Sequence, residues 1–387
     1  MKILFLFSSS SQKSKHSTRS NAYCHRILNI EQHCRRLGAE TDTLFLKDLF
    51  FKSPLLIQTL NLPSVLRYLR SFDVVHAGGP GAAFFCALAT RLIGHNTIVV
   101  YDVHSDALTE RRLIKKNSFD FAGYFTEFQT LLTEYVALRG TKYFIASSPE
   151  IKRRFLKRKP SHIKPENVEV ILNGVDLEQF VPEKDDDTWV ASKPHMFTVT
   201  YAGSFSRIEA VDNLISAAEM LSNVEDINFK FIGFSEEEFN IKINIQKRLG
   251  NRALLIDWLP RSKLLTELQK SDVLVIPADA STREQSENRS AVFVTKFAEF
   301  LAVGKPVIVT ELDLTSKIVE TFDCGFVCKP TVESIAEAIL KAKGTSRDIL
   351  FMKGQNGRRF AETELDENLI CKKYLQFLNR IIKQNDT

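Results

Sequence analysis

The chain has 387 residues, of which 44% are hydrophobic and 26% charged, with 16 Gly and 12 Pro. These values exclude a disordered, collagen-like or low-complexity chain, and the length predicts two domains with a core each. The net charge of +5 is uneven, because residues 1–180 hold 25 Lys and Arg against 16 Asp and Glu, and the rest hold 27 against 31. A basic first half is typical of an anionic partner, but no zinc-finger, RNP-type or basic-zipper pattern indicates nucleic acid.

Short apolar segments rich in Val, Ile and Phe alternate with longer amphipathic segments along the first half. The pattern predicts buried strands at residues 2–7, 73–76, 97–103, 143–146 and 168–172, and helices at 21–37 and 148–157. No apolar run approaches the ~18 residues that a membrane-spanning helix needs.

The second half repeats this alternation. Strands are predicted at residues 197–201, 229–232, 253–256, 273–276, 306–309 and 325–327, and helices at 210–221, 264–270, 295–303 and 332–343. Continuous apolar strands between helices indicate parallel sheets covered on both faces. The fold class expected is therefore α/β, with two doubly wound, Rossmann-like domains and a ligand crevice at the carboxyl ends of the strands.

The acidic run 183–187 follows an Asn-Gly turn at Asn173 and cannot join a core, so it marks the domain boundary. We expect an N-terminal domain at residues 1–182 and a C-terminal domain at 183–364. Residues 365–387 carry apolar side chains at helical spacing and are expected to form a helix that packs on a domain surface.

The six cysteines indicate neither a metal site nor a disulfide framework, because none is in CxxC spacing or near a histidine cluster. Reduced thiols are typical of a cytoplasmic protein. The cysteines are Cys24, Cys34, Cys86, Cys324, Cys328 and Cys371.

Three segments of distinctive sequence occur in order: Asn-Gly-Val-Asp at 173–176 with Phe180 and Pro182, Tyr-Ala-Gly-Ser-Phe at 201–205, and Lys-Phe-Ala-Glu-Phe-Leu-Ala-Val-Gly-Lys-Pro at 296–306. This ordered set resembles the retaining family-four glycosyltransferases (glycosyl transferases group 1). The resemblance implies the GT-B fold, two Rossmann-like domains facing each other across a cleft. It also implies that the C-terminal domain binds a nucleotide sugar and the N-terminal domain an acceptor.

The resemblance implies a donor site at the helix that starts near Thr295. A helix N-terminus offers unpaired amides to a diphosphate, Lys296 adds a cation, and Glu299 lies one turn further on the same face, where it would accept ribose hydroxyls. The implied donor-binding residues are Gly203, Ser204, Arg207, Gly233, Val294, Thr295, Lys296 and Glu299. The implied catalytic residues are His104, Lys296 and Glu299. Taken without the other motifs, Lys296 and Glu299 also fit a solvated ion pair, and His104 also fits a structural histidine.

The chain departs from the family pattern at the diphosphate clamp. Ser204 and Glu209 stand where relatives carry Arg and Lys, Arg207 lies between them, and Ala291 replaces the first of two glutamates.

Basic residues precede an aromatic-rich segment at 119–128, which is typical of an anionic membrane surface or an anionic acceptor. They are Arg111, Arg112, Lys115 and Lys116. A solvated face above buried aromatics is the alternative.

The function expected is transfer of a hexose-type sugar from a nucleoside diphosphate sugar, UDP- or GDP-linked, to a glycan or lipid-linked acceptor with retention. No placed carboxylate suggests a nucleophile, so front-face displacement is the hypothesis, and no metal or other cofactor is required. The expected location is the cytoplasm, peripheral on the inner face of a membrane. Two alternatives remain: a non-catalytic partner subunit of a glycosyltransferase, or a nucleotide-sugar epimerase or sugar phosphorylase of the same fold.

Overall fold

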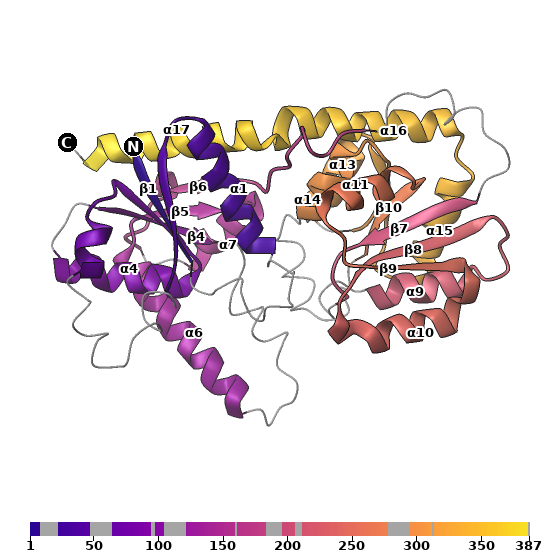
Figure 1. Cartoon of the computed structure of the whole chain (residues 1–387), viewed down its shortest axis with the longest axis horizontal. Coiled ribbons are helices and arrows are strands. Elements are labelled where there is room, and N and C mark those ends of the chain that lie inside the picture. The colour runs from indigo at the N-terminus through magenta and orange to yellow at the C-terminus, as the bar shows by residue number, and fades with distance from the viewer. Residues whose placement is uncertain are drawn as a thin grey trace. The chain divides into compact units, whose positions relative to one another are not determined.

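The computed structural model describes residues 1–7, 22–46, 64–93, 97–103, 121–158, 161–182, 196–205, 211–277, 295–311 and 313–385. Its chain divides into two compact units (Figure 1). The first comprises Met1–Asn173 together with Glu367–Thr387, and the second comprises Gly174–Asp366.

A six-stranded parallel sheet forms the centre of the first unit, in the order β2-β1-β3-β4-β5-β6. The strands are β1 (Lys2–Phe7), β2 (Glu40–Phe45), β3 (Val74–Gly78), β4 (Ile98–Val103), β5 (Tyr143–Ala146) and β6 (Val168–Val170). Strands β1, β3, β4 and β5 are almost wholly buried, which is why their sequences are continuous apolar runs.

Helices cover both faces of this sheet (Figure 1). They are α1 (Ala22–Arg36), α4 (Pro80–Ile93), α6 (Phe121–Gly140), α7 (Pro149–Arg158) and α17 (Glu367–Asn385). Helices α1 and α17 pack together on one face, and α4 packs with α6 on the other. Helix α17 buries apolar side chains at helical spacing into the core of the first unit, so the C-terminal residues complete this domain.

The second unit is built around another six-stranded parallel sheet, in the order β12-β11-β10-β7-β8-β9. Its strands are β7 (Phe197–Ala202), β8 (Ile227–Phe234), β9 (Ala253–Asp257), β10 (Val273–Ile276), β11 (Val307–Thr310) and β12 (Gly325–Cys328). Its helices are α9 (Val211–Met220), α10 (Phe239–Leu249), α11 (Arg261–Gln269), α13 (Thr295–Ala302), α14 (Asp313–Thr321), α15 (Val332–Lys343) and α16 (Arg347–Phe360). The predicted doubly wound α/β class is confirmed in both units.

The order of the second sheet reverses between β7 and β10, which lie side by side. In open α/β sheets a ligand binds outside the carboxyl ends of the strands at such a reversal. A ligand site is therefore expected at the loop after β7 and the start of α13.

Strand β2 was not among the predicted strands. Its sequence, Glu-Thr-Asp-Thr-Leu-Phe, lies at the edge of the sheet and is nowhere fully buried. An edge strand needs no continuous apolar run, because only one neighbour and part of one face cover it.

Candidate functional site

Two glycines bring the ends of β7 and β8 into close contact. Gly203 follows β7 with a φ of +153°, and Gly233 lies near the end of β8 with a φ of +118°. A Cβ at Gly233 would lie 2.4 Å from the carbonyl oxygen of Gly203, so a side chain cannot be accommodated there. The two strand ends thus meet backbone to backbone, because neither glycine carries a side chain between them.

Lys296 lies directly against this glycine pair. It is the second residue of α13, and its Nζ would be 2.7 Å from a Cβ placed on Gly203. The ammonium group donates to the Oη of Tyr201 at 3.4 Å and lies 4.9 Å from the centre of that ring. Helix α13 therefore brings a cation and its first turn to the half-buried backbone of Gly203.

The loop after Gly203 is held from two sides. The Tyr201 hydroxyl donates to the carbonyl of Ser204. The amide of Phe205 donates to Glu238 at 3.1 Å, and the ring of Phe205 stacks on Phe234 with centroids 3.9 Å apart. Ser204 therefore contributes a carbonyl that is held in place by Tyr201.

Glu299 lies one turn after Lys296 and is almost fully buried. Its Oε1 accepts from the Arg261 guanidinium at 2.8 Å. Burial raises the pKa of Glu299, and the positive charges of Arg261 and Lys296 oppose that rise. The carboxylate is thus part of a charge cluster in which Arg261 is its direct partner.

Arg261 was not predicted from the sequence. It is the first residue of α11, directly after the Leu-Pro pair at 259–260, but it lies 38 positions before Glu299. An arginine at the start of a helix carries no local signal for a partner so distant in sequence.

Phe180, four positions after the Asn-Gly-Val-Asp motif, is linked to α13 through Arg358. Phe180 is fully buried, and the Arg261 guanidinium lies 5.8 Å from its ring centre. Arg358 donates to the carbonyl of Phe180 at 2.6 Å and to that of Ala302, the last residue of α13, at 2.8 Å. Arg358 therefore ties the end of α13 to Phe180, whose ring lies beside Arg261.

The structure thus brings together Gly203, Gly233, Lys296 and Glu299, with Ser204 in the adjoining loop and Thr295 as the first residue of α13. Other residues singled out from the sequence lie outside the described residues: His104, Arg207, Glu209, Ala291, Val294, Arg111, Arg112, Lys115 and Lys116.

Among the described residues, no group of three or more His, Cys, Asp or Glu side chains could hold a metal ion. None of the helices in the described ranges has the length and apolar character that crossing a membrane takes.

Two family models match successive parts of the chain. The model described as Glycosyltransferase Family 4 matches residues 32–179, and the one described as Glycosyl transferases group 1 matches residues 184–347. The two matches together take in most of the chain, which is therefore similar to these glycosyltransferases along both halves. The second match includes Gly203, Gly233, Arg261, Lys296 and Glu299.

One curated relative of this chain is an Escherichia coli protein named UDP-Gal:alpha-D-GlcNAc-diphosphoundecaprenol alpha-1,3-galactosyltransferase. It is 28% identical over 273 residues, which is 65% of each chain. The match therefore spans slightly less than two thirds of that relative's length.

Solved structures share the fold of this chain. Sucrose-phosphate synthase from Thermosynechococcus elongatus has a TM-score of 0.75 and 15% identity, covering 99% of this chain and 100% of its own. Anabaena HepE in complex with UDP-glucose has a TM-score of 0.70 and 18% identity, covering 98% of this chain and 100% of its own. At these identities the similarity establishes the GT-B architecture.

Proposed function

We propose that this protein transfers a hexose-type sugar from a UDP-sugar to a lipid-linked or glycan acceptor, with retention of the anomeric configuration. One observation carries the proposal: the Lys296 ammonium group lies over Gly203 at the N-terminus of α13. A cation, first-turn amides and a backbone without side chains together suit a diphosphate. The Escherichia coli relative named for UDP-Gal and the Anabaena structure with UDP-glucose favour uridine as the base.

In the proposed reaction, the enzyme stabilises the diphosphate as it leaves the sugar. Negative charge develops on the diphosphate oxygens, and a preorganised cation beside helix amides lowers the energy of that state. Lys296 is preorganised by Tyr201, which holds its ammonium group through a hydrogen bond and through the ring face. This role needs no protein nucleophile and fits front-face displacement.

Glu299 is proposed to accept the hydroxyls of the donor ribose. Arg261 positions the carboxylate from the side of α11, and its charge favours the ionised form that a hydroxyl acceptor needs. Arg261 is thus a positioning residue for the donor. His104 is proposed to contact the donor sugar or its diphosphate, on the family resemblance.

Nucleotide binding tests the site directly. In a thermal-shift panel of UDP, GDP, ADP, TDP and CMP, with and without magnesium, we expect a shift with UDP. Ligand at a hundred times its Kd stabilises the folded protein by ~2.7 kcal/mol, which corresponds to a few degrees. Product analysis with UDP-galactose, UDP-glucose and a lipid-linked acceptor would then identify the sugar and the product anomer.

Lys296→Ala should abolish the UDP shift. Lys341→Ala is the matched control, because Lys341 also belongs to the second unit and its ammonium group lies 5.9 Å from the ring centre of Phe326. A UDP shift that survives in Lys296→Ala would show that the site is wrong. If no nucleotide shifts the melting temperature of folded wild-type protein, the result would instead favour a non-catalytic partner subunit.

A further inference from the structure

Helix α6 exposes an apolar stripe along one face. Phe125 and Phe128 are each 62% exposed, and Leu132 and Tyr135 are each 52% exposed. Their spacing of three, four and three residues places them on the same side of the helix. Ala137, fully buried, marks the opposite side, and α4 packs against this helix. Contiguous apolar surface of this kind is rare on a protein that does not bury it against something.

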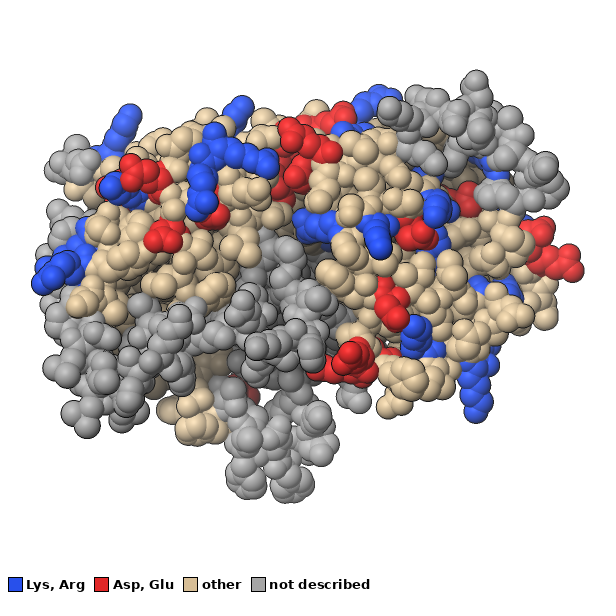
Figure 2. All heavy atoms as spheres, in the orientation of Figure 1, with Lys and Arg blue, Asp and Glu red and all other residues tan. Residues whose placement is uncertain are grey.

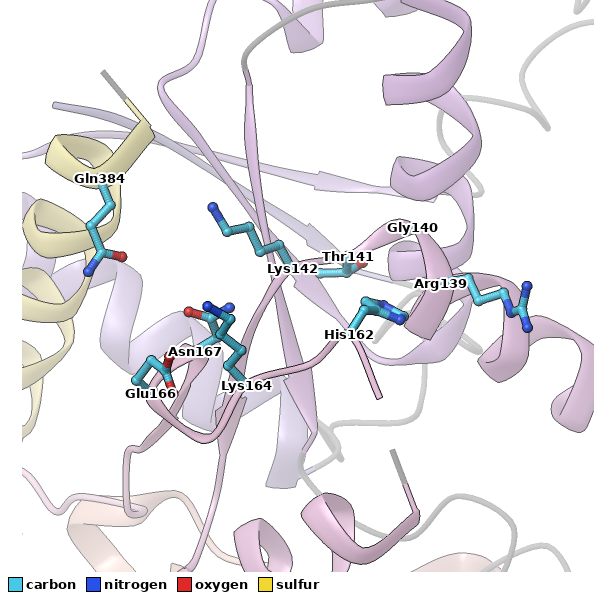
Figure 3. Close-up of a pocket in the computed structure, with 9 residues that line it drawn as sticks. All are labelled: Arg139, Gly140, Thr141, Lys142, His162, Lys164, Glu166, Asn167 and Gln384. Atoms are coloured by element: carbon cyan, nitrogen blue, oxygen red, sulfur yellow. The ribbon is translucent and has the colours of Figure 1, made fainter. Parts of the chain in front are cut away.

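The stripe leads to a basic pocket at the C-terminal end of α6. Arg139 lies on the same face, and its guanidinium is 4.8 Å from the ring centre of Tyr135. Arg139 also lines a cavity of about 530 Å³, formed by the end of α6, the start of β5, the loop before β6 and the end of α17 (Figure 3). The stripe and the pocket are therefore one continuous surface, which we call the α6 surface.

Positive charge dominates the pocket. Arg139, Lys142 and Lys164 line it together with His162, and Glu166 is the single carboxylate among its lining residues. Figure 3 shows Lys142 extending toward α17, where its Nζ lies 3.5 Å from the Oδ1 of Asn385. The side chain of Thr141, another lining residue, is buried and its hydroxyl has no hydrogen-bond partner in the described part of the chain.

In the sequence, four basic residues also come shortly before Phe121, where α6 begins. They are Arg111, Arg112, Lys115 and Lys116. On the face drawn in Figure 2, by contrast, the blue and red side chains of the described residues are interspersed. Within the described residues, apolar side chains along α6 are followed by the basic residues of the pocket at its C-terminal end.

The chemistry of this surface selects one occupant. A second copy of the chain could bury the stripe but would bring its own cations against those of the first copy, which is unfavourable. An anionic bilayer offers apolar chains to Phe and Leu, an interfacial layer to Tyr, and phosphate groups to Lys and Arg. We propose that the α6 surface docks this protein on an anionic lipid bilayer, with the stripe inserted at the interface and the pocket cations on lipid phosphates.

The inference rests on the proposed function for its purpose, since docking would bring the enzyme to a lipid-linked acceptor. Its test does not depend on activity. Flotation of the full-length protein with phosphatidylglycerol vesicles and with phosphatidylcholine vesicles, at low and high salt, measures docking by itself.

The test needs two variants and a matched control. Phe128→Ser with Leu132→Ser removes two stripe residues that are 62% and 52% exposed and four positions apart. Phe239→Ser with Ile243→Ser changes an equivalent pair on α10, which is 62% and 51% exposed and has the same spacing. Lys142→Ala with Lys164→Ala removes two pocket cations.

We expect wild-type protein to float with phosphatidylglycerol vesicles and to be released by salt. The stripe variant should lose binding at least tenfold, the lysine variant should lose about fivefold per cation removed, and the α10 control should bind as wild type does. Wild type, the stripe variant, the lysine variant and the α10 control should all show the same UDP thermal shift. If wild type shows no UDP shift but still binds vesicles, the proposed function is contradicted and the docking inference is not.

Equal binding by wild type and the stripe variant, or no binding by wild type, would overturn the inference. So would self-association of wild type, measured by sedimentation, that the stripe variant abolishes while vesicle binding is absent, because the occupant would then be a second copy.

Discussion

The Nζ of Lys296 lies 2.7 Å from the position that a Cβ on Gly203 would take, and it donates to the Tyr201 hydroxyl at 3.4 Å. A lysine on α13 and a glycine after β7, more than ninety positions apart in sequence, thus form one surface. The absence of a side chain at Gly203 is what lets the cation reach the backbone there.

Gly203→Ala should therefore disrupt nucleotide binding. The new methyl group would meet the Lys296 ammonium group, and the backbone φ of +153° is one that side-chain-bearing residues rarely adopt. We expect UDP affinity, measured by calorimetry, to fall about tenfold or more, since the displaced cation would no longer face the diphosphate.

Gly250→Ala separates backbone strain from displacement of the lysine. Gly250 has a φ of +57°, but a Cβ there meets nothing within 4 Å. This control should lose about 1 kcal/mol of stability and keep its UDP affinity. Equal UDP affinity in both variants would refute the role given to Gly203.

Arg261→Gln should make stability more sensitive to pH. Burial raises the pKa of Glu299, and loss of the Arg261 charge should raise it further. A carboxyl with a raised pKa in the folded state binds its proton more tightly there than in the unfolded state. The contribution of the Glu299 carboxyl to the free energy of unfolding therefore decreases as the pH rises from its pKa in the unfolded state through its pKa in the folded state.

Chemical denaturation at about pH 5 and about pH 7.5 checks this sign. Relative to wild type, the free energy of unfolding of Arg261→Gln should be lower by about 1–3 kcal/mol near neutral pH, and the difference should be smaller in acid. Adding Glu299→Gln should remove the extra pH dependence, because no carboxylate then remains to titrate. A loss that is independent of pH would mean that Arg261 acts through packing alone.

The described cysteines should resist alkylation in the folded protein. Burial raises the pKa of Cys86, Cys324 and Cys328 to about 12. The pKa of Cys34 is raised by its contact with Cys371, whose Sγ lies 3.0 Å away, and by burial. Because only the thiolate is nucleophilic, iodoacetamide at about pH 8 should modify these four sites only after unfolding. Peptide mass spectrometry resolves them, and rapid labelling of any one in native protein would contradict its placement.

Tyr374→Phe should weaken the attachment of α17 to the first unit. The Tyr374 hydroxyl and the Nδ1 of His76 are 3.1 Å apart, and both residues are fully buried. Removing the hydroxyl leaves a buried imidazole nitrogen without this partner, at a cost of about 1–3 kcal/mol.

Hydrogen–deuterium exchange should show lower protection in α17 and β3 of this variant than in wild type. Tyr135→Phe changes a tyrosine that is 52% exposed and should leave protection in these elements unchanged. The same protection in both variants would show that the His76–Tyr374 contact contributes no stability.

Most of the strands could be predicted from the sequence, for a physical reason. A parallel strand buried on both faces is mostly apolar, so β1 and β10 are visible as runs of Val, Ile, Leu and Phe, and β4 and β7 as short segments in which apolar residues predominate. Strand β2 has one neighbour and a mixed sequence, so it left no such run.

Apart from Gly203, Ser204 and Gly233, which the family resemblance implied, the described part of the candidate site was predictable only where residues are close along the chain. Lys296 and Glu299 are three positions apart, so helix periodicity places them on one face without any knowledge of the fold. The sequence by itself therefore determined two α/β units and an α13 that carries a cation and a carboxylate.

Tertiary structure decided the partners of these groups. Arg261 reaches Glu299 from another helix, Gly233 approaches Gly203 from a neighbouring strand, and α17 brings Tyr374 to His76 across almost three hundred positions. Sheet order and helix packing create such contacts, and no local pattern of residues contains them, because it records how each segment folds but not which segments meet.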